Sequence, residues 1–311
     1  MRPALLYVLT LSAFAVSSFV FAQPSENGKL VSKTEYSMPP FASIKAPEKQ
    51  YDAAEYDRAA GDKEFVLERL RYQSDGLTVS AFLYRPKTTK GKLPLIVFNR
   101  GGYIRDDIGA ALVPMFHRLA KEGFVVLAPM YRGSDGAAGK DEVGGEDLND
   151  LMNVIPLVKS LDFVDTGNIF LYGESRGGTM AFQAMRDGFP ANAAATFGAF
   201  TDFQEFIGAR PEMYLPLLRS LWSDYDARKD EIAKRRSALL WADKINVPLL
   251  IMHGGNDQAV DPQQTLSLAR ELQKLRKKYE LLVYAGDDHV LSANQKDRDA
   301  RAVQWFKKHI K

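Results

Sequence analysis

Residues 168–178 read Asn168-Ile-Phe-Leu-Tyr-Gly-Glu-Ser-Arg-Gly-Gly178 and set a serine between two elements of different character. The apolar run that ends at Tyr172 is typical of a strand buried on both faces, and the residues from Arg176 to Asp187 are typical of a helix. Between them, Gly173 to Gly177 fit the pattern Gly-x-Ser-x-Gly, which forms a nucleophile elbow when a strand precedes it and a helix follows. Ser175 is therefore the candidate nucleophile. The alternative is an ordinary serine in a strand-to-helix turn.

Strands and helices alternate on both sides of this turn, after an initial β-hairpin. The predicted strands are 65–72, 77–84, 93–98, 124–128, 168–172, 193–197, 247–252 and 281–284, and the predicted helices are 110–121, 147–161, 176–187, 262–279 and 298–310. Such alternation requires right-handed crossovers and a mostly parallel sheet with helices on both faces. The predicted fold class is α/β with a doubly wound sheet, whose reactive groups collect at the carboxyl ends of the strands.

One segment interrupts the alternation. Residues 201–243 are rich in aromatic and charged side chains and have a helical pattern. Long insertions in compact domains are often lids. We therefore expect a helical cap insertion over the site, with a plain surface excursion as the alternative.

A nucleophilic serine needs a base, because a hydroxyl is a weak nucleophile at its free pKa. The chain has four histidines, at positions 117, 253, 289 and 309. His117 and His309 lie in predicted helices, and His253 ends a predicted strand, where a structural role is expected. His289 follows the last predicted strand, at the same sheet edge as Ser175, and is the candidate general base.

The base needs an acid that holds its tautomer and stabilises its charged form. Asp257 lies in the loop after strand 247–252, between the serine and the histidine in chain order, and Ser–Asp–His is the order of the α/β-hydrolase fold. Asp261 competes, but its position before Pro262 suggests a helix N-cap. Asp257 is therefore the candidate acid.

Acyl transfer also requires two donors for the developing oxyanion. The backbone N–H of Arg176 is the first candidate, and the N–H of Gly102, in the loop after strand 93–98, is the second. Tyr103 and Arg100 flank this loop as candidate substrate-binding residues. Arg100 would pair with a substrate carboxylate or, alternatively, tie loops together. The Arg176 side chain is expected in a structural ion pair, and its candidate partners are Asp141, Glu142, Glu146 and Asp147.

Composition excludes several classes of protein. The 311 residues carry a net charge of only +2 with scattered Lys and Arg, so neither nucleic acid nor an acidic surface is an expected partner. The absence of cysteine excludes disulfides, thiolate catalysis and zinc–cysteine sites. The proposed chemistry needs no metal or organic cofactor.

The N-terminus has the pattern of a secretory signal. Arg2 precedes an apolar stretch that reaches Ala22, which fits a signal peptide over residues 1–22. We expect a secreted or periplasmic protein with no stable membrane association after cleavage, and an uncleaved anchor is the alternative. Residues 23–62 are predicted to be an N-terminal extension or linker, and 63–311 the catalytic domain.

The motifs together resemble the catalytic domain of the prolyl oligopeptidase family of serine peptidases, within the α/β-hydrolases. The matching stretches are Tyr131-Arg-Gly-Ser134, Gly173-Glu-Ser-Arg-Gly-Gly178, Pro248-Leu-Leu-Ile-Met-His-Gly254 through Asp257, and Asp288-His289. The resemblance implies that Ser175, Asp257 and His289 form the triad. Family peptidases usually carry a β-propeller, but residues 23–62 would make only about one blade. Many relatives also read His-Gly-Gly-Pro where this chain reads Arg100-Gly-Gly-Tyr103.

The predicted function is a serine hydrolase that cleaves ester or amide bonds of small substrates or short peptides through an acyl-serine intermediate. Two alternatives stay open. One is a carboxylesterase or deacetylase rather than a peptidase, and the other is a non-catalytic binding protein that retains the fold.

Overall fold

A computed structural model describes residues 26–44, 51–103 and 108–311. The predicted signal peptide, residues 1–22, lies outside these ranges. Within them, no helix combines the length and apolar character needed to span a bilayer.

The described residues form one nine-stranded sheet in the order β1-β2-β3-β5-β4-β6-β7-β8-β9. The strands are β1 Leu30–Glu35, β2 Phe65–Ser74, β3 Leu77–Pro86, β4 Leu93–Asn99, β5 Val125–Pro129, β6 Val164–Glu174, β7 Ala193–Phe197, β8 Leu249–Gly254 and β9 Tyr279–Tyr284. Neighbours from β5 to β9 pair in parallel, whereas β1, β2 and β3 pair antiparallel with one another and β3 with β5. This confirms the predicted mostly parallel sheet.

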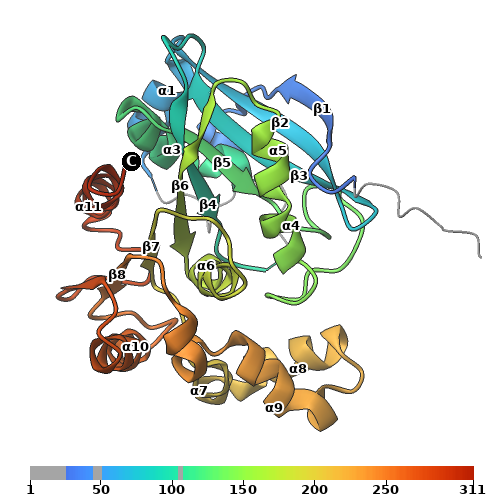
Figure 1. Cartoon of the computed structure of the whole chain (residues 1–311), viewed down its shortest axis with the longest axis vertical. Helices are drawn as coiled ribbons and strands as arrows, with labels where there is room; N and C mark the ends of the chain where they lie inside the picture. The colour runs from blue at the N-terminus through green and yellow to red at the C-terminus, as the bar shows by residue number, and fades with distance from the viewer. Residues whose placement is uncertain (1–25, 45–50, 104–107) are drawn as a thin grey trace, which may run out of the picture.

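Helices cover both faces of the sheet (Figure 1). One face carries α1 (Ala53–Gly61), α2 (Ile108–Ala111), α3 (Val113–Lys121) and α11 (Gln295–Lys307), and the other carries α4 (Leu148–Met152), α5 (Val154–Lys159), α6 (Arg176–Arg186), α10 (Pro262–Lys274) and the 3₁₀ segment η3 (Ala238–Lys244). Successive strand residues enter opposite cores: Phe170 packs with the α3 and α11 layer, and Leu171 with the α6 and α10 layer. This alternation follows from the period of two in a strand, and it explains why the central strands are apolar throughout.

The segment predicted as a cap is helical. It contains α7 (Phe203–Ala209), α8 (Pro211–Leu221) and α9 (Tyr225–Arg236), which lie together beyond the α6 and α10 layer (Figure 1). Their apolar side chains form a third cluster, which also includes Val260 and the half-buried Tyr103 from the loops of the sheet.

Several element boundaries differ from the predicted ones. Strand β1 lies in the segment predicted as an extension or linker, and α10 ends at Lys274 rather than Tyr279, because Arg276 adopts a left-handed φ of 53° and the chain then enters β9. The helices predicted at 110–121 and 147–161 are each broken, near Pro114 and Pro156, because proline has no N–H and its ring clashes with the preceding turn.

Candidate active site

Strand order brings three predicted site residues to one edge of the sheet. Ser175 follows β6 directly, Asp257 lies just after β8, and His289 lies in the loop after β9. Strands β6 to β9 are neighbours in the parallel part of the sheet, so their carboxyl ends open on the same side.

Ser175 occupies a strained turn between β6 and α6. Its backbone has φ 52° and ψ −122°, a conformation that residues other than glycine rarely adopt. The glycine pattern around it is steric in origin. A Cβ at Gly177 would lie 1.9 Å from the carbonyl oxygen of Asn99, and one at Gly173 would lie 2.6 Å from the carbonyl oxygen of Gly177.

Gly177→Ala should therefore destabilise the protein by about 3 kcal/mol or more, because the added methyl meets backbone atoms that cannot rotate away. Urea denaturation of both proteins measures the change in unfolding free energy. Gly61→Ala is the matched control, since a Cβ there meets nothing within 4 Å, and it should be as stable as the parent. A Gly177→Ala protein with the stability of this control would contradict the steric explanation.

The three side chains form a continuous hydrogen-bonded chain. His289 Nε2 lies 2.9 Å from Ser175 Oγ, and His289 Nδ1 lies 2.7 Å from Asp257 Oδ2. With the proton on Nδ1 facing the carboxylate, Nε2 is free to accept the hydroxyl proton of Ser175. Asp257 is buried, whereas the His289 side chain is 24% exposed and Ser175 is partly exposed, so a substrate can reach the serine end of the chain.

Asp257 is the most heavily hydrogen-bonded member of this chain. Oδ1 accepts the backbone N–H groups of Ala259 and Val260 at 2.7 and 2.9 Å, and Oδ2 also lies 3.0 Å from His253 Nε2. Burial alone would raise the pKa of Asp257, but the hydrogen bonds from His253 and His289 outweigh it and hold the pKa well below its usual range. Asp257 is therefore suited to remain an anion beside His289.

His253 has a role at the site that the sequence did not suggest. It is fully buried, and its Nδ1 lies 2.6 Å from Thr265 Oγ1 while its Nε2 faces Asp257. Its spacing of four residues before Asp257, across the end of β8, was the only signal in the sequence. Asp261 instead caps α10, accepting the N–H of Gln263 at 2.8 Å.

The predicted oxyanion donors belong to the elbow itself and to the loop that packs against it. Arg176 is the first residue of α6, where a backbone N–H has no acceptor within the helix. Gly101 packs against the elbow, because a Cβ there would lie 3.3 Å from Ser175 Cβ, and it leads into Gly102 at φ 72°. The Tyr103 hydroxyl donates to the carbonyl of Asp141 at 3.2 Å, and its ring packs against the apolar cluster of α7 to α9.

The substrate-binding role predicted for Arg100 is wrong. Its side chain is completely buried, and its guanidinium donates to the carbonyls of Tyr103 and Met130 and to Ser134 Oγ, each at 2.8 Å. A carboxylate of a substrate has no access to a cation enclosed in this way. Arg100 instead ties together two loops at the sheet edge, which was the alternative interpretation.

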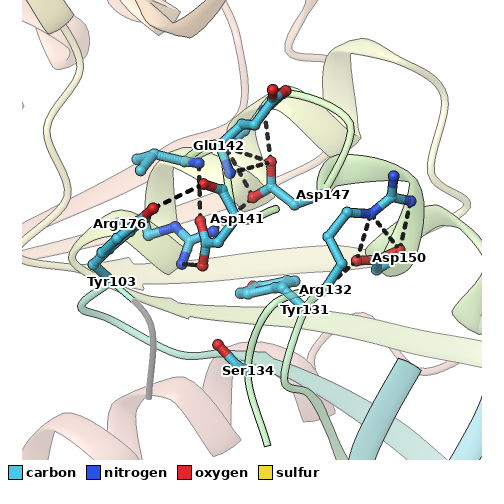
Figure 2. A network of polar contacts seen from close by, with 12 residues as sticks. Tyr103, Tyr131, Arg132, Ser134, Asp141, Glu142, Asp147, Asp150 and Arg176 are labelled. Atoms are coloured by element: carbon cyan, nitrogen blue, oxygen red, sulfur yellow. Dashed lines mark hydrogen bonds and ion pairs between the residues drawn. The ribbon is translucent and has the colours of Figure 1, made fainter. Parts of the chain in front are cut away.

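The Arg176 side chain forms a buried ion-pair network with acidic residues of the 141–150 segment (Figure 2). It pairs with Asp141 at 2.7 Å and with Asp147 at 2.6 Å, two of the four predicted partners. Glu146 pairs with Arg132 instead, at 3.3 Å. Across the described ranges, no cluster of three or more His, Asp or Glu side chains has the arrangement of a metal site.

Comparisons with known proteins place the chain among serine peptidases. Residues 114–311 match the sequence model of the prolyl oligopeptidase family. The chain is 29% identical over 238 residues to the uncharacterized peptidase YtmA of Bacillus subtilis, covering 76% of this chain and 91% of that protein. It is 28% identical over 267 residues to the acylamino-acid-releasing enzyme of Sus scrofa, covering 76% of this chain and 35% of that enzyme.

Solved structures share the fold. The acylaminoacyl peptidase of Pyrococcus horikoshii superposes with a TM-score of 0.66 at 20% identity, over 81% of this chain and 43% of that chain. A puromycin-hydrolyzing peptidase of Mycobacterium tuberculosis also gives 0.66 at 20% identity, over 80% and 40%. This chain thus spans only about two-fifths of either solved chain. The α/β-hydrolase fold predicted from the sequence is confirmed.

Proposed function

The chain belongs to the prolyl oligopeptidase family and is a serine hydrolase, and we propose that it is a peptidase that cleaves short peptides through an acyl-serine intermediate. The hydrogen-bonded chain from Ser175 through His289 to Asp257 is the observation that carries this proposal. Its atoms stand at the distances that proton transfer requires.

Each side chain has one task in the proposed reaction. Ser175 Oγ attacks the substrate carbonyl while its proton passes to His289 Nε2, and Asp257 stabilises the resulting imidazolium. The N–H groups of Arg176 and Gly102 hold the oxyanion. His289 then returns the proton to the leaving amine, and water repeats the sequence to release the acyl group from Ser175.

Aromatic side chains in and next to the 201–243 segment favour a substrate with an apolar side chain. The rings of Phe200 and Phe206 stack with centroids 4.4 Å apart, and Tyr214 lies 4.6 Å from Phe206. Val260 belongs to the same cluster, and its N–H donates to Asp257, so this apolar cluster begins beside the triad acid. We propose that the apolar side chain next to the scissile bond packs here, in a peptide of the kind that acylaminoacyl peptidases are named for.

Labelling of the purified protein with a fluorophosphonate probe, followed by peptide mapping, tests the proposed chemistry. We expect the phosphonyl group on Ser175. A second assay compares N-acetyl-phenylalanine p-nitroanilide and N-acetyl-alanine p-nitroanilide with p-nitrophenyl butyrate. Hydrolysis of the phenylalanine anilide in preference to the alanine anilide supports the peptidase. Cleavage of the ester alone would instead indicate a carboxylesterase, and a protein that resists the probe would be a non-catalytic binder.

A further inference from the structure

We propose that Arg100 is a positioning residue, which holds the Gly101–Gly102 peptide so that the Gly102 N–H faces the reacting carbonyl. This inference rests on the proposed function, since it concerns the oxyanion donor of that reaction.

The guanidinium of Arg100 donates hydrogen bonds to three carbonyls of its own loop. Arg100 Nη1 lies 3.2 Å from the carbonyl oxygen of Gly101, 3.4 Å from that of Gly102 and 2.8 Å from that of Tyr103. Three successive carbonyls thus point towards one buried cation. Charged donors of this kind form stronger hydrogen bonds than neutral ones.

The direction of the Gly101 carbonyl determines the direction of the Gly102 N–H. The peptide bonds of this loop are trans. In a trans peptide the carbonyl of one residue and the N–H of the next point in opposite directions. Because the Gly101 carbonyl faces the buried guanidinium, the Gly102 N–H faces away from it. The elbow is close to this peptide, because a Cβ placed on Gly101 would lie 3.3 Å from Ser175 Cβ.

A glycine pair needs such an anchor. Without Cβ atoms, a Gly–Gly peptide can rotate with little steric resistance, and Gly102 already has a φ of 72°. A rotated peptide would present the Gly101 carbonyl to the oxyanion in place of the Gly102 N–H. Arg176 adds a second hold from the elbow helix, because its Nη1 donates to the Gly102 carbonyl at 3.1 Å.

The anchor itself is fixed from several sides. Arg100 Nη2 donates to Met130 and Ser134, its guanidinium lies 5.1 Å from the ring centre of Tyr131, and it stands 3.6 Å from Asp141. Asp141 also pairs with Arg176, so one carboxylate lies beside both arginines that bond the Gly101–Gly102 loop. A lysine would keep the charge, but its single nitrogen lacks the fork that spans the two loops.

Arg100→Met tests the proposal against a matched control, Arg132→Met. Arg132 is also buried, with 3% of its surface exposed, and pairs with Asp75 at 2.8 Å. It pairs with Asp150 at 2.8 Å as well (Figure 2). Its side chain pairs with Asp75, Glu146 and Asp150, which all lie outside the 99–103 loop, so the control removes a buried ion-paired arginine without releasing the Gly101 carbonyl. The assays are the kcat and KM for p-nitrophenyl butyrate, the inhibition constant of phenylboronic acid, which forms a tetrahedral adduct, and the melting temperature.

We expect Arg100→Met to lower kcat by about 10²–10³-fold, with little change in KM. The inhibition constant of phenylboronic acid should rise by at least about tenfold. Arg132→Met should lower the melting temperature but leave kcat within about threefold of the parent. A folded Arg100→Met protein with parental kcat, or an equal loss of kcat in both variants, would overturn the proposal. If Arg100→Met does not fold, Arg100→Lys keeps the charge beside Asp141 and should show the same loss of kcat. The proposed function is tested separately. It fails if the parent protein neither hydrolyses a substrate nor reacts with the fluorophosphonate probe.

Discussion

Alanine in place of Ser175 should lower kcat by about 10⁶-fold for any substrate that the protein hydrolyses, with KM little changed. Without Oγ no acyl-enzyme forms, and His289 loses the group from which it takes a proton. The remaining rate would come from the oxyanion donors and substrate binding, which act on water as the nucleophile. Initial rates at high protein concentration, together with loss of fluorophosphonate labelling, measure the effect.

The fold should survive this change. Alanine occupies the positive φ of Ser175 no less readily than serine does, and the backbone N–H of Ser175 keeps its 2.8 Å bond to the carbonyl of Phe197. Ser160→Ala is the control, because Ser160 lies at the end of α5 and its hydroxyl donates only locally, to the carbonyl of Leu157. Equal activity in Ser175→Ala and Ser160→Ala would remove Ser175 from the mechanism.

The parallel part of the sheet was predictable because its strands are buried on both faces. Continuous apolar runs such as residues 249–252 can satisfy that environment and few others. Strand β1 was not predictable in this way. It is an edge strand whose residues are exposed after Leu30, and it pairs with β2 through backbone groups that any sequence provides. The breaks in the helices near Pro114 and Pro156 were readable from the sequence, since proline disfavours a continuous helix there.

The site residues differ in the same way. Ser175 has a local sequence signature, because the close contacts of its turn require glycine at positions 173 and 177, two residues on either side. The Arg100 side chain bonds backbone carbonyls of its own loop, which any sequence provides, and side chains or carbonyls of Met130, Ser134 and Asp141, which are distant along the chain. No side chain near position 100 therefore indicates that Arg100 is buried. Long-range partners of this kind decide whether an arginine meets a substrate or the protein interior.

Asp257→Asn should lower kcat by about 10⁴-fold, because the amide would fix His289 in the wrong tautomer. The backbone N–H groups of Ala259 and Val260 both point at Oδ1, so the amide oxygen would occupy that position. The NH₂ group would then replace Oδ2 and face His289 Nδ1 and His253 Nε2. A donor at this position forces the proton of His289 onto Nε2, where it can no longer accept the proton of Ser175.

The same substitution should change how stability depends on pH. The folded-state pKa of Asp257 lies below its value in the unfolded chain, about 3.9. Its contribution to the unfolding free energy is therefore fully present above that value and is lost as the pH falls through the folded-state pKa. The stability advantage of the parent over Asp257→Asn should be largest near neutral pH and shrink below pH about 4.

Asp261→Asn is the matched control for both measurements. It lies four residues further on and only caps α10, a task that asparagine performs as well as aspartate. Its kcat and stability should therefore match those of the parent at pH 7. Urea denaturation at pH 7 and pH 3 and kcat at pH 7 distinguish the two aspartates. If Asp257→Asn kept the kcat of this control, the carboxylate would not be orienting His289, and the hydrogen-bonded chain would be a structural feature of the sheet edge rather than a triad.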